Sequence, residues 1–168
     1  KLAGIVSVEI ERLPKSMVIA LDVSRPGVVI GRGGGGIEDV KNVILGVLKE
    51  GKRVVKDLKI DVRVNEVKNP EISAHLVATR IAAELERRMP HRRVVSRAIE
   101  RVMVSGALGV KVVLGGRIEG AEISRVVKFQ QGSVPTQTLR EIIDYSEVAA
   151  LGKRGYVGIK VWIHKKED

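Results

Sequence analysis

The chain has 168 residues and carries 30 Lys and Arg against 20 Asp and Glu, a net charge of +10. That length suits one ordinary domain or two small ones, and the positive charge points to a polyanionic partner, nucleic acid or a membrane surface, unless the charge serves solubility alone. Cysteine is absent, which excludes disulfides, Cys-based zinc sites and thiol nucleophiles, and there is neither a signal-peptide pattern nor an apolar run of the roughly 20 residues that a membrane helix needs.

The chain opens with two segments that alternate apolar and polar side chains. Residues 5–13 place Val6, Val8 and Ile10 on one side, which predicts a half-buried strand. Residues 17–24 predict a second strand after a turn containing Pro14 and Lys15. We therefore expect the two strands to form a hairpin.

A glycine-rich tract then separates two predicted helices. Pro26 suits the first position of a short helix over 26–30, and the tract 31–36 follows it. Residues 37–50 have helical periodicity, and 58–65 alternate as a third strand. The apolar face of the longer helix comprises Ile37, Val40, Ile44, Val47 and Leu48.

Asn69-Pro70 marks a boundary between two predicted domains, 1–69 and 70–168. The second domain should begin with helices over 71–89 and 92–105. From about residue 107 the apolar period returns to two, and a short helix is expected near 137–144. The predicted strands are VKVVL, VVKF and YVGIKVWIH. The expected fold class is α+β in both domains.

The glycine tract admits several interpretations. Gly31 to Gly36 fits the dinucleotide fingerprint G-x-G-x-x-G, but that motif needs a strand directly before it and a parallel strand after its helix. Here a short helix intervenes, and we expect the neighbouring strands to be antiparallel. A P-loop would need Gly-Lys-Ser/Thr, which does not follow. A flexible loop between two helices remains an alternative.

The tract also fits the G-x-x-G loop of a KH domain, through Gly31, Arg32, Gly33 and Gly34. A nucleic-acid backbone can lie close only where no Cβ intrudes, and the amides that open the next helix suit phosphate. Arg32 adds a positive charge. Together with the strand 17–24, the helix would form a groove for single-stranded bases.

A basic stripe is expected on the helix 92–105. Arg93, Arg97 and Arg101 are spaced by four and share a face, with Arg92 beside them and Glu100 as the one opposing charge. Such a stripe is typical of phosphate binding, whereas solvated faces usually mix signs. We therefore predict that these four arginines bind RNA.

Longer motifs show a resemblance to a known family. RPGVVIGRGGGGIEDV, with two strands before it and one after it, resembles a type II KH domain. In the second half, ELERRMPHRRVVSRAIERVMVSGALGVKVVLGGRIEGAEISR, GSVPTQTLREIIDY and YVGIKVWIHK follow in order the C-terminal domain of the ribosomal protein S-three family. The chain departs from that family in lacking a helix before the first strand, in Ser96 where a basic residue is common, and in four consecutive glycines at 33–36.

The resemblance implies a structural protein of the cytoplasmic small ribosomal subunit, with no enzymatic activity and no cofactor. Its partners would be ribosomal RNA, messenger RNA and neighbouring proteins, the tenth and fourteenth of the subunit. By resemblance, Arg92, Arg93 and Arg97 would line the path by which messenger RNA enters. The rivals are a KH regulator that binds RNA off the ribosome and a nucleic-acid lyase or nuclease. Residues facing ribosomal RNA would include Arg117, Arg125, Lys128 and Arg140.

Other candidates carry less chemistry. For those four cations, surface ion pairs with Glu122 or Asp144 are an equal alternative. His75, His91 and His164 lack metal-ligand spacing, so they are expected to be structural or solvated. The single Trp162 lies in an apolar strand, which favours packing in the core over base stacking.

Overall fold

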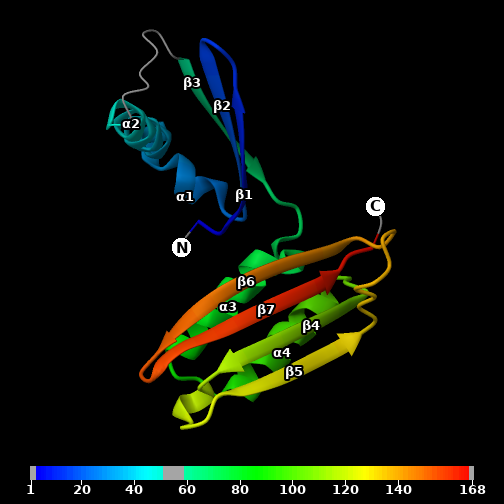
Figure 1. Cartoon of the computed structure of the whole chain (residues 1–168). Coiled ribbons are helices and arrows are strands. Elements are labelled where there is room, and N and C mark those ends of the chain that lie inside the picture. Colours follow the sequence, from blue (N-terminus) through cyan, green and yellow to red (C-terminus); the bar gives the residue numbers. More distant parts are fainter. Residues whose placement is uncertain (1–2, 51–58, 167–168) are drawn as a thin grey trace. The chain divides into compact units, whose positions relative to one another are not determined.

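The computed structural model describes residues 3–50 and 59–166, and the chain divides into two compact units, Lys1–Lys68 and Asn69–Asp168. Each unit has its own sheet with helices on one face (Figure 1). The fold class is α+β, as expected from the alternation of apolar periods.

The first unit is a three-stranded sheet with two helices inserted between its second and third strands. β1 pairs antiparallel with β2, which confirms the hairpin, but β2 pairs parallel with β3. The expectation of antiparallel strands around the glycines was therefore wrong. The helical connection carries the chain back across the sheet, and a crossover of that kind places the strands that it joins in parallel. The elements are β1 Ile5–Arg12, β2 Ser16–Val23, α1 Pro26–Ile30, a 3-10 turn η1 Arg32–Gly34, α2 Gly35–Glu50 and β3 Lys59–Glu66.

Its core lies under the centre of the sheet and leaves the edge strand bare. The apolar residues of α1 and α2 pack with β2 and β3. Val8 and Ile10 stand opposite Leu21 and Ile19 on the same face of the sheet, yet they are 51% and 62% exposed. The strand predicted from alternation is therefore present, but its apolar side chains are exposed, so the prediction that it is half-buried was wrong. Val47, assigned to the inner face of α2, is also exposed.

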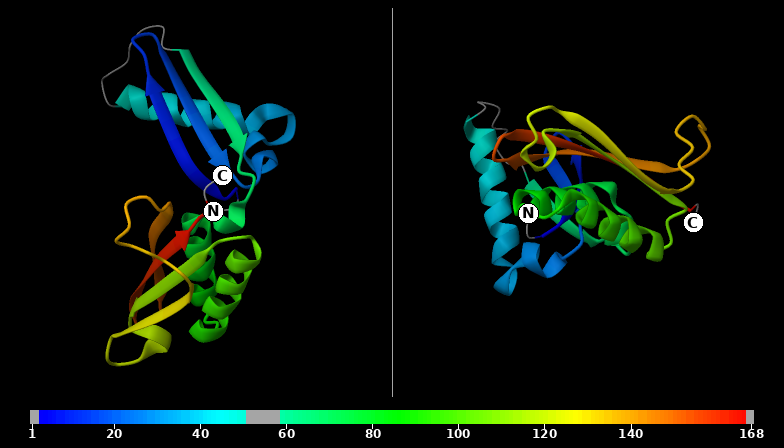
Figure 2. Two further views of the ribbon diagram at one scale, coloured as in Figure 1. Left: turned by 90° about the vertical axis from the view of Figure 1, so that its right-hand side faces the viewer. Right: turned by 90° about the horizontal axis from the view of Figure 1, so that it is seen from below.

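The second unit is a four-stranded antiparallel sheet in the order β5-β4-β7-β6. Two helices lie against one face, α3 over β6 and β7 and α4 over β4 and β5 (Figure 2). The elements are the 3-10 turn η2 Pro70–Ile72, α3 Ala74–Glu86, α4 His91–Val104, β4 Gly109–Gly116, the 3-10 turn η3 Ile118–Gly120, β5 Arg125–Gly132, β6 Ile143–Gly152 and β7 Gly155–His164. The two helices were predicted within a few residues of these bounds.

One strand of this sheet was missed. Residues 137–144 form no helix, and β6 begins at Ile143 and pairs along its whole length with β7. Asp144 on β6 accepts a hydrogen bond from the Ala74 backbone amide at 3.1 Å, so a carboxylate from the sheet caps the start of α3. The polar residues that obscured this strand therefore have a structural use.

The core of this unit is aliphatic. Leu114, Ile159, Ile163 and Ile81 are fully buried between the sheet and the helices. Trp162 alternates with those β7 residues and lies on the opposite face, with its ring centroid 5.0 Å from that of Tyr145. The prediction that Trp162 lies in the core was wrong. Alternation separates the two faces of a strand, but only the positions of the helices show which face is buried.

Candidate nucleic-acid interface

The backbone conformation and the packing of the glycine loop in the first unit both favour glycine. Gly31, Gly33 and Gly34 have φ of +70°, +63° and +83°, values that favour glycine. At Gly36 a Cβ would lie 2.2 Å from the Val29 carbonyl oxygen, so its absence lets α1 and α2 approach. Nothing lies within 4 Å of the Cβ positions of Gly33 and Gly34, which leaves their backbone open to a ligand.

The loop is shorter than the predicted tract 31–36, and the groove expected between α2 and the strand 17–24 is not formed in that way. α2 begins at Gly35 rather than near Ile37, and η1 occupies Arg32–Gly34. The strand 17–24 cannot wall a groove, because β2 is the central strand and its inward side chains are at most 7% exposed. The backbone of α1 lies close to β3, an edge strand of the sheet, and Val29 of α1 packs against the buried side chains of β2 and β3.

The stripe on α4 is an exposed basic surface. Val94, Val95, Ala98, Ile99 and Val102 are buried against the sheet and fix the rotation of the helix. Among the residues that the structure describes, none of the stripe arginines forms a salt bridge. The exposed arginines of the stripe are Arg92, Arg93, Arg97 and Arg101.

The four cations predicted to face ribosomal RNA do not form one cluster in the fold. Arg125 and Lys128 are exposed on β5, and Arg140 is exposed in the segment before β6. Arg117 follows β4, and its Nε donates to the Ala121 carbonyl at 2.8 Å. Asp144 does not pair with any of them, since its Oδ2 lies 2.9 Å from Lys165 Nζ and it caps α3.

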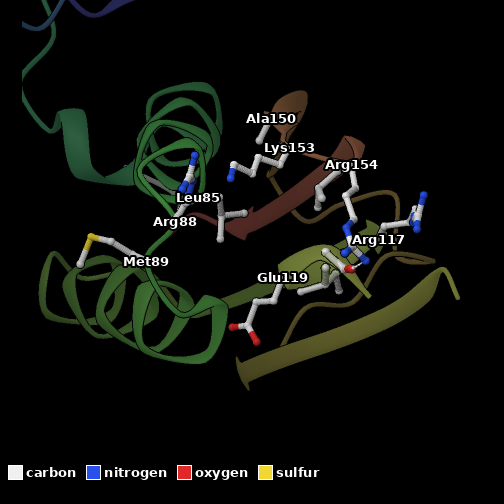
Figure 3. Close-up of a pocket in the computed structure, with 12 residues that line it drawn as sticks. Leu85, Arg88, Met89, Arg117, Glu119, Ala150, Lys153 and Arg154 are labelled. Atoms are coloured by element: carbon white, nitrogen blue, oxygen red, sulfur yellow. Dashed lines mark hydrogen bonds between the residues drawn. The ribbon is translucent and has the colours of Figure 1, made fainter. Parts of the chain in front are cut away.

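Arg117 instead joins three cations that the sequence gave no reason to group. Arg88 follows α3, and Lys153 and Arg154 form the turn between β6 and β7. With Arg117 they line a hollow of about 350 Å³ (Figure 3). The sequence carries only a weak signal for this hollow, a Lys-Arg pair between two glycines at 152–155.

The histidines have structural partners. His91 Nδ1 lies 2.7 Å from Glu119 Oε1, and His75 Nδ1 lies 3.2 Å from Ser146 Oγ. His164 is buried and contacts Ser133 and Glu141. Within 3–50 and 59–166, no group of three or more His, Asp or Glu could hold a metal ion, and no helix has the length and apolarity to cross a bilayer.

Comparisons with known proteins match both units. The KH domain family matches residues 1–72, and the C-terminal domain of ribosomal protein S3 matches residues 81–163. Small ribosomal subunit protein uS3 of Clostridium novyi is 44% identical over 165 residues, which is 98% of this chain and 72% of that protein. The uS3 of Persephonella marina is 46% identical over 165 residues, covering 98% of this chain and 70% of that protein.

The chain belongs to the uS3 family of small ribosomal subunit proteins. The family resemblance read from the motifs is thereby confirmed. Membership makes the chain a structural ribosomal component. The arginine stripe and the open glycine loop are candidate RNA-binding surfaces of this uS3 protein.

Proposed function

We propose that this uS3 protein binds ribosomal RNA within the small subunit and that its α4 arginines help to form the path by which messenger RNA enters. The observation that carries the proposal is the exposed stripe on a helix whose other face is fixed in the core, formed by Arg92, Arg93, Arg97 and Arg101. Its cations form no salt bridge in the described part of the chain, so their charge is available to phosphate.

Binding should rest on counterion release. Each phosphate that a Lys or Arg neutralises on a single strand contributes about 0.7 to the slope of log affinity against log salt. Arg92 lies near Glu119, but that carboxylate already accepts hydrogen bonds from the His91 backbone and ring. Arg92 therefore remains free to meet RNA.

The glycine loop would add a second contact in the same protein. Gly33 and Gly34 present bare backbone beside Arg32, and α2 begins directly after them. The amide groups at the start of that helix suit a phosphate oxygen. The proposed partners are ribosomal RNA, messenger RNA and neighbouring subunit proteins, among them the tenth and fourteenth, in the cytoplasm, and no catalysis is involved.

The test is a salt titration of single-stranded RNA binding by fluorescence anisotropy. Changing Arg92, Arg93 and Arg97 together to Ala should weaken binding and lower the salt slope by about 2, or about 0.7 for each contact. The matched control changes three exposed cations outside both candidate surfaces, Arg12, Lys15 and Lys59, to Ala. An unchanged slope in the α4 variant would reject the stripe as the RNA surface.

A second experiment separates the ribosomal role from its rivals. Tagged protein is sedimented from lysate, and the particles are washed at high salt. Retention on the small subunit supports an integral component. Protein left at the top of the gradient would favour a KH regulator that acts off the ribosome, and turnover of nicked or abasic DNA would favour the enzymatic rival.

A further inference from the structure

The hollow between α3, η3 and the β6–β7 turn has the size of a ligand site. Its volume of about 350 Å³ falls within the roughly 300–1,000 Å³ of small-ligand pockets. The floor is apolar and comes from four different elements or turns of the second unit. The apolar floor consists of Leu85, Ile118, Ala150 and Val157.

Four cations surround this floor. In Figure 3, Arg88 and Lys153 lie toward one end of the hollow and Arg117 and Arg154 toward the other. None of the four forms a salt bridge with a carboxylate in the described ranges. The hollow therefore concentrates positive charge around an apolar surface.

Two of these guanidinium groups are held in place by backbone carbonyls. Arg154 Nη1 donates to Gly120 O at 2.9 Å, and Arg117 Nε donates to Ala121 O at 2.8 Å. A guanidinium has five N–H donors, so each keeps donors for a ligand. Because both groups are already ordered, binding costs less conformational entropy.

The one carboxylate at the hollow is occupied elsewhere. Glu119 points away from the four cations in Figure 3 and accepts hydrogen bonds from the His91 backbone amide and ring. The His91 hydrogen bonds hold the pKa of Glu119 below its ordinary value, so it stays charged without neutralising the cations.

Backbone strain gathers at the same place. Across residues 3–50 and 59–166, the non-glycine residues with positive φ are Arg88, at 62°, and Glu119, at 56°, and both line the hollow. Residues in this region of φ/ψ space cost free energy and cluster at binding sites. At Arg88 the strain places a cation where Asn or Gly would be the easier residue.

We propose that this hollow binds one unstacked nucleotide of single-stranded RNA, with the base against the apolar floor and its phosphates between the paired cations. A nucleotide combines the two properties that the hollow matches, a flat apolar face and neighbouring negative charge. None of the stripe arginines of α4 lines the hollow, although Arg92 lies near Glu119 at its edge, and the hollow would add a base contact to the phosphate contacts made by the stripe. This inference rests on the proposed RNA-binding function and names a new site for it.

The three methionines of the chain give a direct readout. Met89 lines the hollow, whereas Met17 is buried in the first unit and Met103 lies on α4 outside the hollow. In Figure 3 the Met89 side chain points away from the cations, so its backbone serves as the probe. In the full chain with nitrogen-15-labelled methionine, a short single-stranded oligoadenylate should shift the Met89 amide resonance. The signals of Met17 and Met103 should stay in place and report that both units remain folded.

The variants remove charge without removing the floor. Arg88→Asn with Lys153→Gln should weaken oligonucleotide binding about tenfold and reduce the Met89 shift. Asn tolerates positive φ better than Arg, so Arg88→Asn should not unfold the chain. The matched control is Arg87→Asn with Lys166→Gln, two exposed cations that do not line the hollow, and it should change affinity less than threefold.

Each outcome is decisive. One outcome is that RNA binds without shifting the Met89 resonance and with equal affinity for the hollow variant and its matched control. That result would overturn the hollow as a binding site while the α4 proposal stands. Weaker binding by the α4 triple variant, with Met89 still shifted at a saturating strand concentration, would support the hollow as a separate site. Complete absence of RNA binding would reject both. A Met89 shift with adenosine monophosphate but none with the strand would make the ligand a free nucleotide, and an equal shift with inorganic phosphate would reduce the hollow to an anion site; either result overturns the proposal.

Discussion

His164 clamps the segment before β6 to the end of β7 through both nitrogens of its ring. Nδ1 lies 2.9 Å from the Ser133 carbonyl oxygen and Nε2 lies 2.8 Å from Glu141 Oε2. A carbonyl oxygen only accepts, so Nδ1 carries a proton, and the carboxylate favours a second proton on Nε2. The side chain is 7% exposed, so water reaches it poorly.

The cost of removing the ring follows from these contacts. A hydrogen bond to a charged group contributes about 1.5–3 kcal/mol and a neutral one about 0.5–1.5 kcal/mol. Ser133 is exposed and the Glu141 side chain is 40% exposed, so water can replace much of the hydrogen bonding that these two residues lose when the ring is removed. We therefore expect His164→Ala to lower the free energy of unfolding of the second unit by about 1–2 kcal/mol, or its Tm by about 5–15 °C.

The pH dependence has a definite sign. The hydrogen bond to Glu141 is the main reason that the pKa of His164 is raised, with the Ser133 carbonyl acting in the same direction and burial opposing both. A raised pKa means that the stabilisation is fully present below the unfolded value of about 6.5 and is lost as pH rises through the folded pKa. Glu141→Gln should therefore destabilise at pH 6 and be neutral at pH 9, where the Gln amide can donate to the neutral ring.

Urea unfolding followed by tryptophan fluorescence measures this unit alone, because Trp162 is the single tryptophan of the chain and lies two residues from His164. Wild type, His164→Ala and Glu141→Gln are compared at pH 6 and pH 9. An equal cost of Glu141→Gln at both values would refute the charged clamp. No cost of His164→Ala at pH 6 would refute the estimate made from the two hydrogen bonds.

Two further substitutions test the packing of each unit. Gly36→Ala should destabilise the first unit by about 1–3 kcal/mol, because its Cβ would lie 2.2 Å from the Val29 carbonyl oxygen, whereas Gly35→Ala meets nothing within 4 Å and should be neutral or stabilising. Urea unfolding followed by circular dichroism compares them, and equal stabilities would contradict the close approach of the helices. Arg80→Met removes a paired contact with Glu71, Nη1–Oε2 at 2.5 Å and Nη2–Oε1 at 2.7 Å, and should cost about 1 kcal/mol at pH 7. Arg80 lowers the pKa of Glu71, so this cost should shrink as pH falls below about 4, and a cost that stays constant between pH 7 and pH 3 would contradict it.

Local periodicity predicted most of the helices and strands because each signal is carried by neighbouring residues. α4 was expected over 92–105 and runs from His91 to Val104, since its apolar residues repeat at helical spacing. The Arg93, Arg97 and Arg101 stripe follows from the same spacing, so it too could be predicted from the sequence.

The burial of β1 and the presence of β6 depend on contacts between distant parts of the chain, and the spacing of apolar residues does not reveal those contacts. β1 alternates as expected, but alternation identifies only a face, and the apolar residues of the helices pack with β2 and β3. β6 reads IDYSEVAALG, and Asp144, Ser146 and Glu147 break its apolar pattern. In the fold, Asp144 caps α3, Ser146 contacts His75, and the Glu147 carboxylate lies 3.7 Å from Lys160 Nζ. None of these partners is a close neighbour in the sequence.

The same distinction explains why one candidate surface was predicted and the other was not. The stripe lies on one helix, so a spacing of four is enough to assemble it. The hollow takes Arg88 from the turn after α3, Arg117 from the end of β4 and Lys153 with Arg154 from the β6–β7 turn. The pairing of β6 and β4 with β7 brings the last two together, and the packing of α3 on β6 and β7 adds the first. A charge excess of ten indicates a polyanionic partner, whereas the pairing of the strands determines where cations and an apolar surface lie side by side.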